Sequence, residues 1–395
     1  MATAASCPRK RESRSDVRAA YERRAPLNLA PMRSAPPPLR VGMTAALSGR
    51  YQTQGRQALL GIQAWVEETN RVGGIQLQGQ QRPVALIVYD DASDATRCGV
   101  YTERLLTADR VDILFGPYSS GLTLRAAESA AQYQHVLWNH GGALEPASAW
   151  AIGLLTPAPY YFHGVIDLVR QTTPACARIV IVHSTAGAFP RAVAAGAAQY
   201  SQAQGCQVTT LPYAPRTTDF TAVLDQLAAA QPHLVLGVGR IEDDVRFAQQ
   251  YVHGAVRATA VALIATPLTL FRDTLGRDAS RFLGPSQWEP GLVVCPDYGP
   301  TAQEVLQRLA FYAPQGVDYP MAQAYAAGLV AQRCLEVTPA LDQQVMLHTA
   351  RQLDFTTFYG RYRLDPTTGR QVGHVMPVVQ WQGRRKVIRW PSPSI

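Results

Sequence analysis

The sequence predicts an α/β protein with two similar lobes, each built around a doubly wound parallel sheet. From Leu39 onward, short β-branched runs alternate with amphipathic stretches, which is the pattern of strands whose sheet is covered by helices on both faces. Two prolines interrupt the alternation within residues 156–159, after which it starts again. A chain of 395 residues is also long for a single core, and two compact units are the usual arrangement at that length.

The first series of elements predicts the first lobe. Its strands are expected at residues 39–44, 84–91, 111–116 and 135–139. Its helices are expected at residues 55–71 and 94–109 and directly after residue 119. The first of these helices is expected to end at the pair Gly73-Gly74, because glycine readily adopts the conformation that terminates helices.

The second series predicts the second lobe. Its strands are expected at residues 178–183, 206–211, 233–239 and 259–265, with helices between them. Three more helices are expected at residues 301–312, 319–336 and 340–352. In the last segment, 374–390, alternating runs flank a Gln-Gly turn. That pattern is typical of an antiparallel hairpin.

The basic charge of the chain is concentrated near its beginning. The net charge is +8, and residues 1–40 hold nine Lys or Arg against three Asp or Glu. Residues 1–38 are rich in arginine and proline and lack apolar periodicity, so we expect a disordered tail. We interpret this tail as a leader or as sequence upstream of the true start, with a nucleic-acid-binding arm as the alternative. The folded part gives no indication of a nucleic-acid partner.

Neither an export signal nor a membrane span is predicted. No apolar segment follows the arginines of the tail, as an ordinary secretory signal would require. No stretch approaches the ~18 uninterrupted apolar residues of a transmembrane helix. The six cysteines are scattered, without the C-x-x-C spacing of zinc or redox sites. Cys176 and Cys206 begin two neighbouring strands and could lie together, but buried free thiols are favoured over a disulfide.

The segment FGPYSSGLT, residues 115–123, joins a predicted strand to a predicted helix. The first amides of a helix have no partner within the helix, and together with the helix dipole they favour an anion. Ser119, Ser120 and Thr123 add hydroxyl groups, and Gly121 lets a ligand approach the backbone. This corner therefore has two interpretations: it binds a carboxylate, or its serines only cap the helix.

The sequence contains no motif for catalysis, so no catalytic residue, metal site or cofactor is predicted. The phosphate loop G-x-x-x-x-G-K-[ST], the G-x-S-x-G elbow and H-E-x-x-H are all absent. Gly237 and Gly239 form only a fragment of a dinucleotide fingerprint, and a turn at the end of a strand is the favoured interpretation. No base accompanies the serines of residues 115–123 to activate them.

Several motifs resemble those of the leucine/isoleucine/valine-binding protein family, the type I solute-binding components of ABC transporters. The resemblance rests on four segments: Ala46-Leu47-Ser48-Gly49 with Gly55 and Gly61, Asn70 to Ile75, the acidic turn Asp90 to Asp94, and GPYSSG. The late segment YGRYRLDPTTGRQVGHVMPVVQWQ is similar to the hairpin signature of the family. Together these segments cover the chain from about Leu39 to Trp390.

The resemblance implies a type I periplasmic binding protein fold, with two lobes joined by a three-strand hinge that closes on a small molecule. Lobe 1 is then expected to contain residues 39–155 and 295–357. Lobe 2 is expected to contain residues 156–294 and 358–395. The implied partners are a small-molecule ligand (an amino acid, an organic acid or an amide) and a transporter permease. The implied location is the periplasm or the cell surface, with the cytoplasm as the alternative in the absence of a visible signal, and we expect a monomer.

By position, the resemblance also implies a set of ligand-binding residues. On the first lobe they are Ser119, Ser120, His140, Gly141 and Gly142, with Tyr51 and Gln54 as further walls. On the second lobe they are Phe189, Arg240 and Trp288. A lone tryptophan is more often a core residue than a contact, so both interpretations of Trp288 stay open, as do those of His140, which either replaces a hydroxyl of the family or faces solvent.

Two departures from the family pattern affect the expected ligand. Arg240 stands where many members have a tyrosine, and the acid that commonly pairs with a ligand ammonium has no counterpart in ALIATPLTL. Asp243 and Asp244 lie near Arg240 but are expected to begin a helix, where acids suit the dipole. An unpaired buried ammonium is costly, so the ligand is either an amino acid, as in the family, or a carboxylate, an aromatic acid or a short amide.

Three functions are compatible with the sequence. A solute-binding protein of an ABC importer is favoured. An intracellular sensor of the same fold is the alternative, suggested by the basic tail and the missing signal. A nucleotide-using oxidoreductase rests only on the turn at Gly237 and Gly239.

Overall fold

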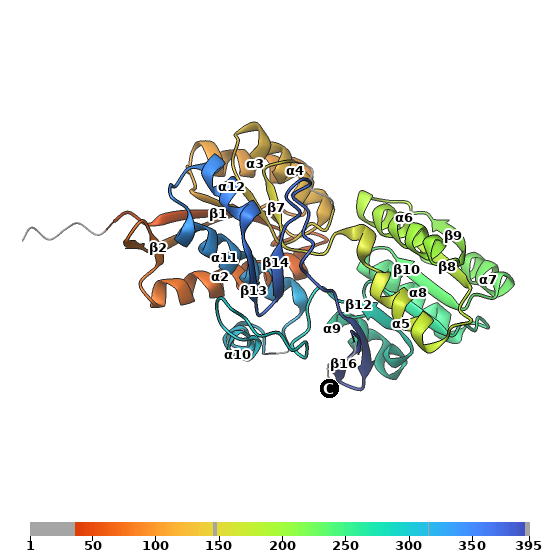
Figure 1. Cartoon of the computed structure of the whole chain (residues 1–395). Helices are drawn as coiled ribbons and strands as arrows, with labels where there is room; N and C mark the ends of the chain where they lie inside the picture. The colour runs from red at the N-terminus through yellow and green to blue at the C-terminus, as the bar shows by residue number, and fades with distance from the viewer. Residues whose placement is uncertain (1–35, 145–147, 315, 392–395) are drawn as a thin grey trace, which may run out of the picture. The chain divides into compact units, whose positions relative to one another are not determined.

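The computed structural model describes residues 36–144, 148–314 and 316–391 (Figure 1). The tail expected at residues 1–38 therefore lies outside the described residues except for its last three positions. From Pro37 onward the chain forms one contact unit. Two large sheets with helices on their faces make up most of this unit, so the predicted α/β fold class is confirmed.

The first sheet contains five parallel strands in the order β4-β1-β5-β6-β7. The strands are β1 (Leu39–Ala45), β4 (Val84–Asp90), β5 (Ile113–Phe115), β6 (Leu137–Asn139) and β7 (Ala151–Gly153). The helices of this part are α2 (Gln52–Arg71), α3 (Ala95–Thr107), α4 (Ser120–Gln132), α10 (Ala302–Tyr312), α11 (Tyr319–Val337) and α12 (Gln343–Gln352). Val41 and Met43 of β1 share a core cluster with Trp65 of α2, while Leu114 and Leu137 pack into a separate cluster with residues of α3 and α4. Both faces of the sheet are thus covered, as a parallel sheet requires.

The second sheet has the order β16-β15-β12-β11-β10-β8-β9. Its parallel strands are β8 (Arg178–Ser184), β9 (Gln207–Tyr213), β10 (Leu234–Val238), β11 (Ala260–Leu263) and β12 (Leu283–Pro285). The C-terminal hairpin β15 (Val378–Gln382) and β16 (Arg385–Trp390) joins this sheet antiparallel to β12. The accompanying helices are α5 (His163–Thr172), α6 (Ala188–Ala203), α7 (Thr221–Ala230), α8 (Ile241–His253) and α9 (Thr269–Leu275), with 3-10 helices η1 (Ala158–Tyr160) and η2 (Gly276–Arg281).

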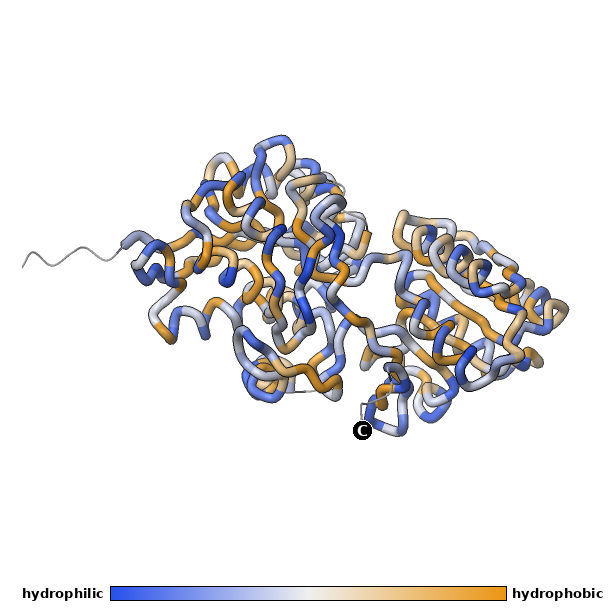
Figure 2. Tube along the Cα trace, viewed as in Figure 1, coloured by the Kyte–Doolittle hydropathy of each residue, from blue (hydrophilic) through white to orange (hydrophobic). Residues whose placement is uncertain are grey.

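The apolar sequence runs coincide with the strands of both sheets. Figure 2 shows hydrophobic stretches along the strands, whereas the helices alternate hydrophobic and hydrophilic positions. In β10, all five residues are buried, which is what a central parallel strand demands. In the described ranges, no helix is long and apolar enough to cross a membrane.

The sequence did not predict one short strand in each sheet: β7 in the first sheet and β12 in the second. Two small antiparallel pairs were also missed: β2 (Ile75–Leu77) with β3 (Gln80–Arg82), and β13 (Asp354–Thr357) with β14 (Gly360–Arg363). The β13–β14 pair crosses the lobe boundary expected at residues 357 and 358. The lobe limits therefore stay a proposal, with the two large sheets as the centres of the two lobes.

Both sheets have a topological switch point, where successive strands are added to opposite sides of one strand. In the first sheet, β4 lies on one side of β1 and β5 on the other; in the second, β9 and β10 flank β8. In open parallel sheets, ligands bind beyond the carboxyl ends of the strands at such points. A ligand is therefore expected at the exits of β1 and β5 and at those of β8 and β10.

The segments that connect the two sheets are tied together by hydrogen bonds. Thr156 and Gln287 form two reciprocal bonds: the Thr156 amide donates to Oε1 at 3.2 Å, and Nε2 donates to the Thr156 carbonyl at 3.0 Å. Thr156 Oγ1 lies 2.7 Å from His374 Nδ1. Three segments far apart in the sequence are thus joined, in agreement with the three crossings implied by the resemblance.

The cysteines of the described ranges are free thiols: Cys98, Cys176, Cys206, Cys295 and Cys334. Cys206 and Cys176 are neighbours, as expected, since Cys206 Sγ lies 3.7 Å from the Cys176 carbonyl oxygen. Arg170 donates a hydrogen bond to Cys206 Sγ at 3.1 Å. The interpretation as buried free thiols is confirmed for this pair.

Candidate functional site

The exit of β5 leads through Gly116 and Pro117 directly into α4, as the motif predicted. Ser119 is the N-cap of α4: its side chain accepts a hydrogen bond from the Leu122 amide at 3.4 Å. Its φ of 95° and ψ of 143° lie in a region that residues with side chains rarely adopt. Such strain costs on the order of 1–3 kcal/mol and concentrates at functional sites.

The front of α4 has backbone donors without a partner. Among the described residues, no hydrogen bond is found for the amides of Ser120 and Gly121, whereas the amides of Leu122 and Thr123 are both bonded to Ser119. Gly121 is exposed, and a Cβ atom added to it would meet nothing within 4 Å. These two amides, at the positive end of a helix dipole, are therefore accessible to an anion.

Ser120 contacts the exit of the neighbouring strand. Its Oγ accepts a hydrogen bond from the Ala143 amide at 3.2 Å. The hydroxyl of Ser120 can still donate a proton to a further acceptor, because this bond uses only a lone pair of its oxygen. Ser119 thus caps α4 and Ser120 joins two corners, and the binding of a carboxylate at this corner stays a prediction.

At the exit of β6, the backbone amides expected to bind a ligand are bonded to a side chain of the same segment. The amides of Gly141 and Gly142 both donate to Asn139 Oδ1, at 3.1 and 2.8 Å. A Cβ atom on Gly141 would lie 2.1 Å from the Pro117 carbonyl oxygen, so glycine is needed there for packing against residues 117–118. The two glycine amides are therefore already occupied, and the role of Asn139 was missed.

His140 is fully buried, so the expectation that it faces solvent is wrong. No hydrogen-bond partner is found for its Nδ1 or Nε2 among the described residues. Burial lowers the pKa of His140 to about 4, and the ring is neutral at pH 7. That the His140 ring replaces the hydroxyl group found at this corner in other family members stays a prediction.

The exit of β1 is fixed by a network of hydrogen bonds to the exit of β4. Asp90 accepts from the Leu47 amide and the Ser48 hydroxyl, both at 2.9 Å. The Ser93 hydroxyl accepts from the Tyr51 amide at 3.0 Å. The acidic turn that resembles the family motif thus has a structural task, which is to hold the beginning of α2 in place.

Tyr51 and Gln54 lie at this beginning of α2, beside the β5 exit. The Tyr51 ring contacts the Tyr118 ring edge-on, with centroids 6.4 Å apart, and Gln54 is buried. The Tyr118 hydroxyl lies 3.4 Å from the Tyr319 hydroxyl, and burial raises the pKa of Tyr118 to about 12. The structure therefore brings Tyr51 next to the corner of Ser119 and Ser120. It also adds Tyr118 to the candidate site, a residue of the segment FGPYSSGLT that was not singled out from the sequence.

On the second sheet, the exit of β8 leads into α6. Phe189 lies in the first turn of α6, and its ring contacts the Tyr161 ring edge-on at 5.2 Å. The helices α6 and α4 contact each other, so α6 lies near a helix of the first sheet. Tyr161, which sequence analysis missed, belongs to the segment that connects the sheets.

Arg240 follows β10 at the switch point and is the N-cap residue of α8. Its side chain is half-buried; no hydrogen bond or ion pair is found for its guanidinium among the described residues, although its charge acts on Asp243 and Tyr213. Asp243 and Asp244 lie in the first turn of α8, as predicted. Gly239 has a packing task, because a Cβ atom there would lie 1.8 Å from the Tyr213 hydroxyl. This contact supports a turn and not a dinucleotide fingerprint.

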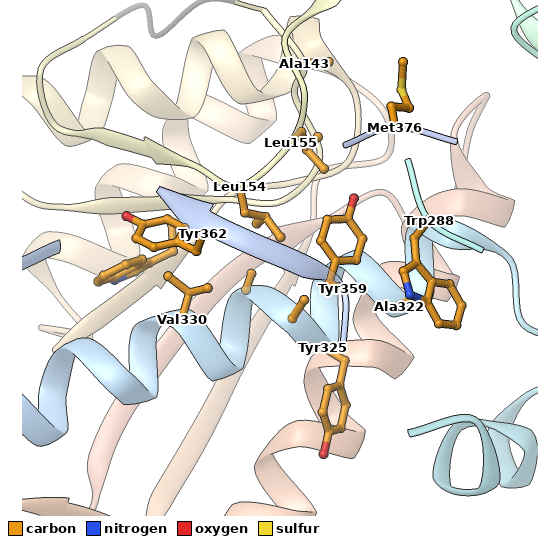
Figure 3. Packing of buried hydrophobic residues seen from close by; sticks show 14 of the residues in the cluster. Ala143, Leu154, Leu155, Trp288, Ala322, Tyr325, Val330, Tyr359, Tyr362 and Met376 are labelled. Carbon is orange, nitrogen blue, oxygen red and sulfur yellow. The ribbon is translucent and has the colours of Figure 1, made fainter. Parts of the chain in front are cut away.

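Trp288 follows β12, two strands away from the switch point. Its side chain is buried, its Nε1 donates to the Phe358 carbonyl at 3.1 Å, and its ring contacts the Phe358 ring edge-on. Figure 3 shows Trp288 near Tyr325 and Tyr359. Trp288 is a core residue with a satisfied donor, which favours the core interpretation over that of a ligand contact.

A small pocket lies at the exits of β6 and β7, beside Gly142, Leu155 and Gln371. Its volume of about 20 Å³ is enough for one water molecule and too small for an amino acid. No group of three or more His, Cys, Asp or Glu in the described ranges is arranged to hold a metal ion. The two switch points thus combine hydrogen-bond donors, aromatic rings, one arginine and carboxyl groups.

Comparison with known proteins decides the family. The model of the periplasmic binding protein family matches residues 38–386. The chain belongs to this family. The resemblance found in the sequence motifs is therefore confirmed.

Solved structures share the fold of this periplasmic binding protein. A leucine-binding protein from Thermotoga maritima has a TM-score of 0.78 at 15% identity, over 89% of this chain and 97% of that chain. A branched-chain amino acid transporter substrate-binding protein from Streptococcus pneumoniae, in complex with isoleucine, has a TM-score of 0.75 at 15% identity, over 89% and 99%. A solute-binding protein from R. palustris, in complex with benzoate, has a TM-score of 0.73 at 15% identity, over 89% and 95%. These similarities show the type I periplasmic binding protein fold.

Proposed function

We propose that this protein is the solute-binding component of an ABC importer, and that it binds an amino acid or a similar small carboxylate or amide between its two lobes. The observation that carries the proposal is the front of α4. There, the amides of Ser120 and Gly121 have no partner in the described part of the chain, and Gly121 borders open space. An anion receptor of this kind holds a carboxylate without a cationic side chain.

The surroundings of that receptor also suit binding. It lies at the switch point of the first sheet, and Phe189 and Arg240 lie at the switch point of the second. Relatives of the same fold bind isoleucine and benzoate, which supports a small carboxylate as the ligand. We further propose a transporter permease as the partner, a periplasmic or cell-surface location and a monomeric state.

Binding without catalysis is part of the proposal. The hydroxyls of Ser119 and Ser120 contact the amides of Leu122 and Ala143, and no described residue is bonded to either of them as a base. A nucleophilic serine needs such a base. The turn at Gly239, filled by Tyr213, leaves no space for the close approach of a pyrophosphate to that residue.

The proposal is tested by thermal unfolding and calorimetry with ligand-free protein and a panel of amino acids, organic acids and amides. A ligand at a hundredfold excess over its Kd stabilises the folded state by ~2.7 kcal/mol. We expect Ser120→Ala to weaken binding of the best ligand by ~1–3 kcal/mol, the usual value of a hydrogen bond to a charged group. The empty protein should lose about 1 kcal/mol, because the Ala143 amide loses its partner.

Two controls accompany this variant. Ser280→Ala removes an exposed hydroxyl of η2 and should change neither affinity nor stability. A Ser120→Ala protein that loses stability but keeps its affinity would show that this serine is only structural. A panel without any stabilising compound would count against the function as a whole.

A further inference from the structure

The acids near the switch point of the second sheet are occupied by the protein itself. Asp244 is buried, and its Oδ2 accepts a hydrogen bond from the Ala265 amide at 3.0 Å. The carboxyl group thus reaches from the first turn of α8 to the exit of β11. A ligand cation could reach it only by breaking this link between two corners.

Asp243 lies in the first turn of α8, three residues after the N-cap residue Arg240. Its side chain is 2% exposed, and Arg246 Nη1 lies 3.9 Å from its Oδ1. Its Oδ2 has no hydrogen-bond partner among the described residues. Burial raises the pKa of Asp243, and the neighbouring Arg240 opposes this effect. Arg240 and Arg246 thus already supply positive charge to this carboxyl group. Because its Oδ2 is free, Asp243 is nevertheless the acid to test as the partner of a ligand ammonium.

Two acids near the switch point of the first sheet, Asp90 and Asp318, are also occupied. Asp90 accepts hydrogen bonds from Leu47, Ser48 and Ala92. Asp318, the N-cap residue of α11, accepts from the Thr269 hydroxyl at 2.9 Å. Its other oxygen lies 3.5 Å from Gln57 Nε2. Neither carboxylate is available to neutralise a ligand ammonium.

The positive groups near the two switch points are less occupied. The amides of Ser120 and Gly121 have no partner in the described part of the chain, and Arg240 forms no hydrogen bond or ion pair there. Arg240 is always charged and lies at the front of α8, where the dipole adds positive potential. An anionic ligand would therefore meet complementary charge on both sheets, whereas in the described part of the chain an ammonium group would meet Asp243 Oδ2, whose charge Arg240 and Arg246 already balance.

We propose that the ligand is a carboxylic acid without an ammonium group, and that Arg240 pairs with one of its oxygens and determines this specificity. This inference rests on the proposed function and narrows its ligand class. The carboxylate binds at the front of α4, and the aromatic rings of Tyr51, Tyr118 and Phe189 surround the body of the ligand. Arg240 binds a second carboxylate or a carbonyl oxygen from the opposite sheet.

The test is calorimetric titration with pairs of compounds that differ only in the amino group. The pairs are leucine and 4-methylpentanoate, phenylalanine and 3-phenylpropanoate, and glutamate and glutarate. We expect the acid of the best-binding pair to bind at least tenfold more tightly than its amino acid. Arg240→Gln should weaken the binding of that acid at least tenfold. The melting temperature of the variant shows whether the protein is still folded.

The matched control is Arg277→Gln, which removes the same charge from an exposed position of η2 and should change the affinity less than twofold. An amino acid that binds as tightly as its deaminated partner would overturn the inference, and so would an unchanged affinity in Arg240→Gln. If Asp243→Asn then abolishes binding of that amino acid, Asp243 is the partner of the ligand ammonium, and the protein prefers amino acids to acids without an ammonium group. These outcomes leave the binding function intact, whereas the absence of binding by every compound contradicts both proposals.

Discussion

Ser119 occupies a backbone conformation that glycine adopts more easily than any residue with a side chain. Its φ is 95°, and its hydroxyl caps α4 through the Leu122 amide. Glycine relieves strain on the order of 1–3 kcal/mol, whereas replacing a serine cap by glycine costs only a few tenths. We therefore expect Ser119→Gly to raise the free energy of unfolding of the empty protein by about 1 kcal/mol.

Urea unfolding and calorimetry of the same variant separate stability from function. If the Ser119 hydroxyl also binds ligand, the stabilised variant binds more weakly, which explains why a strained residue with a side chain occupies this corner. Ser129→Gly, in the interior of α4, is the matched control and should lose stability, because glycine is unfavourable within a helix. A Ser119→Gly protein that is less stable than the natural one would contradict the strain argument.

The sequence could predict which residues stand at the site but not how their side chains are bonded. Ser119 and Ser120 were selected because turn residues between an apolar run and a helix mark a strand exit, whereas Arg240 was selected through the resemblance to the family. That Asn139 occupies the amides of Gly141 and Gly142 depends on the packing of one corner against another. Its signal was an asparagine two residues before a pair of glycines, a combination that favours local side-chain bonds to the backbone.

At the scale of elements, the long strands and helices were predictable because their patterns are long and periodic. The strand β1 and the hairpin β15–β16 lie close to the expected ranges. The missed strands β7 and β12 have three residues each, too few for a pattern to be distinguished from a loop. Their places are set by pairing with β6 and with β11 and β15, which is tertiary information.

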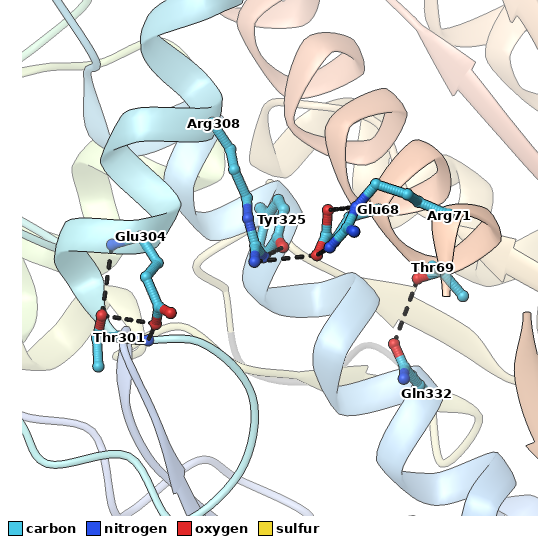
Figure 4. A network of polar contacts seen from close by, with 8 residues as sticks. All are labelled: Glu68, Thr69, Arg71, Thr301, Glu304, Arg308, Tyr325 and Gln332. Atoms are coloured by element: carbon cyan, nitrogen blue, oxygen red, sulfur yellow. Dashed lines mark hydrogen bonds and ion pairs between the residues drawn. The ribbon is translucent and has the colours of Figure 1, made fainter. Parts of the chain in front are cut away.

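The helix α10 shows how one element is attached to its neighbours. Thr301 and Glu304 form a capping box at its beginning, in which the Thr301 hydroxyl accepts from the Glu304 amide and the Glu304 carboxylate accepts from the Thr301 amide. Further along, Arg308 pairs with Glu68 of α2 at 2.9 Å and donates to the Tyr325 hydroxyl of α11 at 2.8 Å (Figure 4). The cap therefore fixes the beginning of a helix whose middle joins α2 to α11.

We expect Thr301→Ala to lower the free energy of unfolding by about 1 kcal/mol, the usual cost of a lost N-cap. Thr301→Ser keeps the hydroxyl and should change the free energy of unfolding by only a few tenths of a kcal/mol. Guanidinium unfolding followed by circular dichroism measures both variants. Equal stability of the alanine and serine variants would show that the capping box contributes nothing in solution.

At the scale of the whole molecule, the two sheets share one apolar core. The cluster that contains Val41 and Met43 of β1 also contains Ile179 and Ile181 of β8. The connecting segments belong to it as well, through Tyr161 and Phe358. Cooperative unfolding of both sheets follows from this continuity, since neither sheet can lose its packing without exposing apolar surface of the shared cluster.

Trp288 provides the test of that cooperativity. Its ring contacts Phe358 with centroids 5.6 Å apart, and Phe358 contacts Tyr325 of α11 at 5.8 Å. Trp288→Phe removes the hydrogen bond to the Phe358 carbonyl and leaves a cavity, so we expect a loss of about 2 kcal/mol. Differential scanning calorimetry should show one transition that moves to lower temperature as a whole, while Trp150→Phe at a half-buried position moves it less. Two transitions, of which only one responds to Trp288→Phe, would mean that the sheets unfold separately and that the connecting segments do not couple them.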